Sequence, residues 1–140
     1  MKVFLDANIL CSAAKSDGAM RELLRQLAAH EHELWVDELV IEEARRNLTA
    51  KVPQSEGELD ELLQTLRQAR HPRTSRELRE SLPVVEKDRP VLAAALGLRC
   101  EVLVTGDRTH FGALYGRRIH GVLVLSPREA ALRLLPPAKR

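Results

Sequence analysis

Four short strand-like runs are the feature that most constrains how this 140-residue chain folds. They lie at residues 3–5, 33–36, 101–104 and 122–125, and amphipathic, helix-forming sequence separates each from the next. Apolar strands of this kind are typical of a parallel sheet that helices cover on both faces. The sequence therefore predicts an α/β fold with a mostly parallel central sheet.

The apolar residues between these strands recur at helical spacing. They predict helices that begin near residue 16 and near residue 74, and further helices at about 39–52, 59–66, 91–98, 109–115 and 127–135. The length suits one hydrophobic core, and no low-complexity linker interrupts the pattern. We expect a single domain over residues 1–135, followed by a short C-terminal tail at 136–140.

Composition excludes several classes of protein. No apolar run approaches the roughly 20 residues that a membrane span needs, so we expect no membrane-embedded segment. Cys11 and Cys100 lie far apart in the sequence, which indicates reduced, half-buried thiols in a cytoplasmic protein. With only four aromatic residues, the chain is a poor candidate for a nucleic-acid binder that stacks bases on aromatic side chains.

Charge is distributed unevenly although the formal net charge is only +2. Residues 1–66 are net acidic and residues 67–140 are net basic. Such asymmetry is found in proteins that bind nucleic acid, and equally in proteins whose charges are scattered and solvated. Both interpretations stay open at this point.

Acidic residues follow two of the predicted strands. Asp6 ends the first, and Asp107 comes three residues after the third. Ligands of open parallel sheets bind outside the carboxyl ends of the strands, near a change in strand order. Carboxylates gathered there repel one another unless a cation such as Mg²⁺ or Mn²⁺ neutralises them. The alternative is a solvated acid or a helix cap, a role for which Asp88, ahead of Pro90, is well suited.

Four sequence blocks resemble those of the PIN-domain nucleases, in the order of that family. Residues 5–10, Leu-Asp-Ala-Asn-Ile-Leu, resemble the Asp-x-Asn end of the family's first strand. Residues 36–48 and 88–95 are similar to its second and third blocks, and residues 102–108, Val-Leu-Val-Thr-Gly-Asp-Arg, to its fourth. Many small bacterial members are VapC-like toxins, each inhibited by a small antitoxin that is encoded beside it.

The resemblance implies a three-layer α/β/α domain that hydrolyses RNA phosphodiester bonds with Mg²⁺ or Mn²⁺. It also implies a cognate antitoxin partner and a homodimer. The residues that match the family's catalytic, metal-binding acids are Asp6, Glu43, Asp88 and Asp107. Asn8 and Thr105 match the polar residues that orient those acids.

Two details of the site stay open. Glu42 is an alternative to Glu43, which we prefer because it adjoins the apolar side of the predicted helix. Thr109 stands where several family members carry a further acid, so the number of metal ions, one or two, is undecided.

Basic residues near the acids are candidates for contacts with substrate. Arg89 and Arg108 each directly follow a predicted metal-binding acid, where they are placed to contact RNA phosphates. His110 is close enough in sequence to Asp107 to approach the same cleft, but the pattern does not require it as a base.

The leading hypothesis is a metal-dependent endoribonuclease that acts as the toxin of a toxin–antitoxin pair. Two alternatives are a catalytically silent PIN-like module that binds RNA or protein, and a housekeeping RNA-processing nuclease. A small phosphatase is disfavoured, since Asp6-Ala7-Asn8 lacks the second aspartate of a phosphoaspartate motif.

Overall fold

The computed structural model describes residues 1–137, which form an α/β domain around a six-stranded sheet. The strands are β1 (Lys2–Leu5), β2 (Glu33–Asp37), β3 (Arg67–Ala69), β4 (Val102–Val104), β5 (Arg118–Ile119) and β6 (Val122–Leu125). Their order in the sheet is β3-β2-β1-β4-β6-β5, and every pairing is parallel except that of β5 with β6. The predicted fold class, with a mostly parallel sheet, is confirmed.

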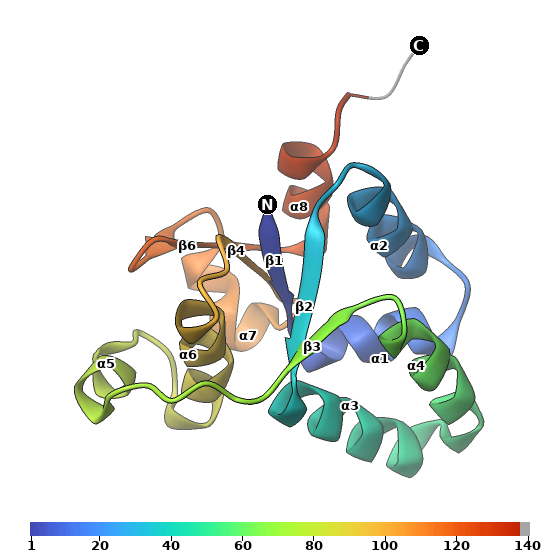
Figure 1. Ribbon diagram of the computed structural model, residues 1–140, viewed down its shortest axis with the longest axis horizontal. Helices are drawn as coiled ribbons and strands as arrows, with labels where there is room; N and C mark the ends of the chain where they lie inside the picture. Colours follow the sequence, from blue (N-terminus) through green and yellow to red (C-terminus); the bar gives the residue numbers. More distant parts are fainter. Residues whose placement is uncertain (138–140) are drawn as a thin grey trace.

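Helices cover both faces of this sheet and complete three layers (Figure 1). They are α1 (Ala7–Lys15), α2 (Ala19–Ala29), α3 (Glu38–Lys51), α4 (Glu56–Leu63), α5 (Arg76–Ser81), α6 (Arg89–Gly97), α7 (Arg108–Phe111) and α8 (Pro127–Leu134). Short 3₁₀ turns lie at Pro53–Ser55, Glu86–Asp88 and Gly112–Leu114. In Figure 1, α1, α2 and α4 lie on one side of the sheet, and α5, α6 and α7 lie on the other.

The central strands are apolar throughout because both of their faces are covered. Phe4, Leu103 and Leu125, one from each of three neighbouring strands, have no exposed surface. This explains why these strands read as continuous apolar runs instead of alternating with polar residues.

Three elements differ from the sequence-based expectation. Helix α1 begins directly after Asp6, where no helix was predicted, and it buries Ile9 and Leu10 against the core. Strand β3 is polar and lies at the edge of the sheet, so its sequence carried no strand signal. Strand β5 has only two residues, too few to show a pattern.

Two apolar segments, on α4 and α8, differ in burial. Leu59 and Leu63 on α4 are buried in the core, whereas Leu132 on α8 is 71% exposed. Helix α8 ends at Leu134. Of the predicted tail, residues 138–140 lie outside the described part of the chain.

The strand order reverses between β1 and β4, and this switch point positions the site. Leu5 of β1 is in register with Val104 of β4, and the Asp6 amide donates to the Val104 carbonyl at 3.1 Å. The residues that follow these two strands therefore lie side by side at one edge of the sheet, as expected for ligand sites in open parallel sheets. Within residues 1–137, no helix is long and apolar enough to cross a membrane.

Both cysteines are more deeply buried than expected, which leads to a prediction about their reactivity. Burial raises the pKa of the Cys100 thiol to about 11, from a usual value of 9.0, and it raises the pKa of Cys11 as well. Since only the thiolate reacts, Cys100 in the native protein at pH 8 should be alkylated about 100-fold more slowly than an exposed thiol. Both cysteines should react fully in urea, and rapid alkylation of the folded protein would contradict this burial.

Candidate metal centre

Asp6 is held in place by three hydrogen-bond donors at the end of β1. Its Oδ1 accepts from the Ala7 amide at 2.8 Å and caps α1, while its Oδ2 accepts from the Thr105 hydroxyl at 2.7 Å and from Asn8 Nδ2 at 3.1 Å. The side chain is buried, with only 5% of the residue exposed. Its carboxylate is therefore fixed in one orientation.

Asn8 and Thr105 join the end of β1 to the end of β4. Asn8 Oδ1 accepts from the Gly106 amide at 2.8 Å, and the Thr105 hydroxyl accepts from the Asp107 amide at 3.2 Å. The Tyr115 hydroxyl donates to the Thr105 carbonyl at 2.7 Å, which holds the backbone that follows β4. Asn8 and Thr105 thus both contact Asp6, and their role in orienting a metal-binding acid stays a prediction.

The environment of Asp6 disfavours its charged form. Burial raises the pKa of Asp6, and the nearby carboxylate of Glu43 raises it further, although the bonds from Thr105, Ala7 and Asn8 act in the opposite direction. A perturbed acid in a cleft is typical of a functional site. A nearby positive charge would restore the ionised form.

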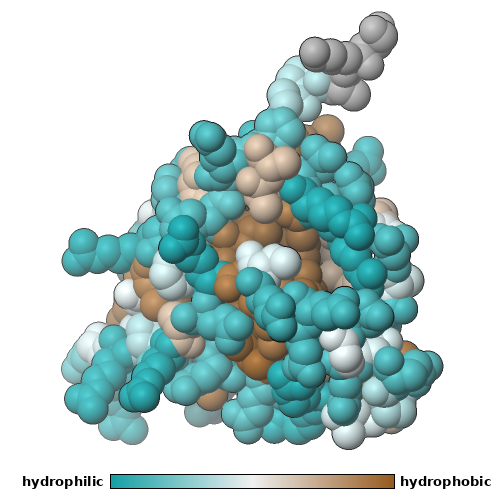
Figure 2. Space-filling view, turned by 45° about the vertical axis from the view of Figure 1, so that its right-hand side comes forward, coloured by the Kyte–Doolittle hydropathy of each residue, from teal (hydrophilic) through white to brown (hydrophobic). Residues whose placement is uncertain are grey.

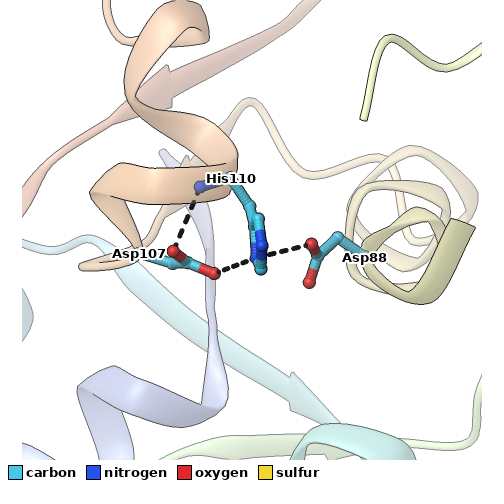
Figure 3. A group of neighbouring side chains, drawn as sticks. All are labelled: Asp88, Asp107 and His110. Atoms are coloured by element: carbon cyan, nitrogen blue, oxygen red, sulfur yellow. Dashed lines mark hydrogen bonds and ion pairs between the residues drawn. The ribbon is translucent and has the colours of Figure 1, made fainter. Parts of the chain in front are cut away.

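Two more acids, Asp88 and Asp107, lie on either side of His110 (Figure 3). His110 Nδ1 lies 2.8 Å from Asp107 Oδ2 and 3.0 Å from Asp88 Oδ2. The His110 amide also donates to Asp107 Oδ1 at 3.1 Å, which caps the single turn of α7. One oxygen of each carboxylate and one ring nitrogen lie within 4.8 Å of one another.

Asp88 sits at the start of α6 but does not cap that helix with its side chain. Its carboxylate is directed to His110, and the buried Oδ2 lacks a hydrogen-bond partner among the described residues. The sequence also allowed Asp88 to be a helix cap. Because its carboxylate does not cap α6, that role does not explain where the carboxylate lies. A buried oxygen without a donor among these residues needs a further partner, and a cation would supply one.

Glu43 faces the other acids from α3. A cleft of about 380 Å³ is lined by residues from four segments of the chain, namely Asp6, Ala7, Asn8, Glu43, Asn47, Lys87, Asp88, Val91, Gly106 and Asp107. The structure thus brings all four predicted acids to one cleft. Glu42 lines a neighbouring hollow with Asp37 and Arg46, so its placement favours Glu43 as the fourth acid.

This set of side chains fits a hard divalent cation. Oxygen donors dominate the cleft, the carboxylates come from separate elements, and the buried Asp88 Oδ2 is left without a proton donor. Mg²⁺ and Mn²⁺ are bound in proteins by a few carboxylates with water in the remaining positions. The site residues match that chemistry.

The two arginines that were predicted to contact substrate lie at the margin of the site. Arg89 donates from Nε to the Val84 carbonyl at 3.3 Å, and Arg108 is exposed on α7. Their role with substrate stays a prediction.

The sequence assigned no role to Lys87 or Asn47, and it did not require His110 at the site. Asn47 is one helical turn beyond Glu43 on α3, a spacing that could have identified it. Lys87 precedes Asp88, and His110 follows Asp107 by three residues, so proximity in sequence was the available signal. It does not say which way a side chain turns.

Known structures share this fold. The chain resembles a chain in the VapBC2 structure from Rickettsia felis bound to a promoter DNA fragment, with a TM-score of 0.65 and 17% identity over 90% of this chain and 98% of that one. A DNA-bound VapBC structure from Salmonella typhimurium matches with a TM-score of 0.66 and 18% identity, over 91% of this chain and 98% of that one. VapBC-1 from nontypeable Haemophilus influenzae matches with a TM-score of 0.59 and 14% identity, over 91% of this chain and 99% of that one.

No curated protein matched the sequence. The model of the PIN domain family, however, matches residues 2–109, a stretch that contains all four acids and the strands that carry them. The strand order, the switch-point cleft and the family match agree, and the chain belongs to the PIN-domain family of nucleases.

Proposed function

We propose that this protein is a Mg²⁺- or Mn²⁺-dependent endoribonuclease and the toxin of a toxin–antitoxin pair. The observation that carries the proposal is the convergence of Asp6, Glu43, Asp88 and Asp107 on one cleft, with a buried Asp88 oxygen that lacks a donor. Close carboxylates without a cation are costly, and a fold that served only as a binding module would gain nothing from them.

Each acid has a distinct part in this proposal. Asp6 is held rigid by Thr105 and Asn8, while Asp88 and Asp107 face each other across the cleft and Glu43 adds charge from α3. A divalent cation held by these acids would supply a nucleophilic water at neutral pH and stabilise negative charge on the phosphoryl oxygens. The buried network around Asp6 keeps the acids in position for that cation.

Basic side chains border the cleft and support a polyanionic substrate. Lys87 lines both the cleft and the neighbouring hollow, where Arg46 lies nearby. With Arg89 and Arg108 they offer contacts to the phosphates of RNA on either side of the cleaved bond. Contacts of this kind give affinity without reading sequence, and they weaken as salt rises.

A protein partner is supported by an apolar hollow on the side of α2 and α4, visible as a brown depression in Figure 2. Leu24, Ala28, Ala29, Leu34 and Leu62 form its apolar lining, and charged residues of both signs border it: Arg21, Arg25, Glu58 and Glu61. Hollows of this kind are typical of sites that receive apolar side chains of another protein. We propose that a cognate antitoxin docks there, in the cytoplasm, on a homodimer of this chain.

Cleavage of RNA tests the enzymatic proposal. Purified protein should cleave single-stranded RNA with Mn²⁺ or Mg²⁺, and EDTA or the substitution Asp6→Asn should lower the rate by at least about 100-fold, because each removes the charge balance of the site. Cleavage should also fall as salt rises. Equal residual activity in wild type and Asp6→Asn would identify the cleavage as contamination and contradict the proposal.

The stability of Asp6→Asn gives an independent test. Burial raises the pKa of Asp6, so its charged form destabilises the metal-free fold at neutral pH, and that penalty disappears as pH falls and the carboxyl takes up a proton. In EDTA at pH 7.5, Asp6→Asn should therefore melt at a higher temperature than wild type. Saturating Mn²⁺ should raise the Tm of wild type alone; a variant that melts lower in EDTA would oppose this account.

Growth assays test the toxin and its partner. Induction should arrest growth, Asp107→Asn should relieve the arrest, and co-expression of the gene next to this one should neutralise wild type. Ala28 is exposed and lines the hollow, so Ala28→Glu should stay toxic but escape neutralisation. Ala50→Glu, on an exposed position of α3, is the matched control and should still be neutralised. If Asp107→Asn is as toxic as wild type, the toxin proposal is wrong.

A further inference from the structure

His110 Nδ1 lies between two carboxylates that it cannot satisfy at the same time. The nitrogen is 2.8 Å from Asp107 Oδ2 and 3.0 Å from Asp88 Oδ2, and it carries at most one proton. The hydrogen bond goes to Asp107, and Asp88 Oδ2 is left buried without a donor. A single proton on His110 Nδ1 therefore leaves one of the two carboxylates without a hydrogen bond.

His110 Nδ1 lies from each of the two carboxylate oxygens at the spacing of neighbouring ligand atoms around a cation. In an octahedral site with ligands at about 2.0–2.1 Å, adjacent ligand atoms are about 2.9 Å apart. The two distances from His110 Nδ1 match that spacing, and both carboxylate oxygens approach the nitrogen from different helices. A cation in contact with all three atoms would satisfy Asp88 and Asp107 together.

Local structure already holds the imidazole in this place. The His110 amide donates to Asp107 Oδ1, so the same acid caps α7 and faces the ring. Thr109, where several family members carry a further acid, is exposed, and the ring of His110, one residue later, lies beside the Asp88 carboxylate. The three side chains are 15–27% exposed, which leaves the cluster accessible to a hydrated ion.

We propose that His110 is itself a ligand of the metal centre, through Nδ1, and that it makes the site select Mn²⁺ over Mg²⁺. This inference rests on the metal dependence in the proposed function. Mg²⁺ takes oxygen ligands and gives up water reluctantly, whereas first-row transition ions accept imidazole nitrogen. Among those ions, Mn²⁺ also suits the carboxylates that complete the site.

Pulsed electron paramagnetic resonance of bound Mn²⁺ tests the contact directly. Wild-type protein loaded with one equivalent of Mn²⁺ should show modulation from a directly bound imidazole ¹⁴N. That modulation should be lost in His110→Asn and kept in His30→Asn, the matched control at the exposed end of α2. Mn²⁺ bound in wild type without ¹⁴N coupling would overturn the proposal, and that result needs no variant to fold.

Titration calorimetry with Mn²⁺ and Mg²⁺ separately tests selectivity. Wild type should bind Mn²⁺ at least about tenfold more tightly than Mg²⁺, and His110→Asp, which offers oxygen in place of nitrogen, should lower that ratio about tenfold. An unchanged ratio would contradict the role of His110 while leaving the metal centre intact. If Mn²⁺ binds wild type and Asp6→Asn equally, or not at all, the metal centre of the proposed function is wrong as well.

Discussion

The hydrogen bond from the Thr105 hydroxyl to Asp6 joins the ends of two neighbouring parallel strands, and the arrangement of the other site residues depends on it. The bond is buried, Thr105 has no exposed surface, and Asn8 closes the same network from α1. Hydrogen bonds to a charged group contribute about 1.5–3 kcal/mol each, so the donors to Asp6 offset much of the cost of burying it. This part of the site is therefore formed without a metal ion.

On the opposite side of the cleft, the negative charges of Asp88 and Asp107 are not fully compensated by hydrogen-bond donors. The oxygens of Asp88 and Asp107 lie within 4.8 Å of each other, and two unit charges at ~4 Å near a protein surface repel by about 4 kcal/mol at an effective dielectric constant of about 20. One histidine proton serves only one of them, and Asp88 Oδ2 stays without a donor. In the proposed site, the rigid side would orient a cation and the uncompensated side would attract it. Such a division would let the site bind a metal ion while the fold remains stable without one.

Much of the fold could be predicted from sequence, because strands covered on both faces must be apolar throughout, as Val3-Phe4-Leu5 is. Polar β3 could not be predicted, since an edge strand carries no such constraint. Helix α1 was missed because it begins directly after β1, with Asp6 alone between the strand and the helix. Asp6 and Asp107 were proposed from their positions after strands, whereas Glu43 and Asp88 were proposed from the resemblance of the sequence blocks to the family. The approach of His110 to Asp88 depends on how α6 and α7 pack, and no local pattern encodes that contact.

The central claim is that a divalent cation binds where these acids converge. Anomalous diffraction from crystals grown with Mn²⁺ tests it most directly. The account predicts a strong anomalous peak in the cleft, in contact with Asp88 and Asp107 and beside the Asp6 carboxylate held by Thr105. An empty cleft at millimolar Mn²⁺, or a peak only at surface carboxylates elsewhere on the molecule, would contradict it.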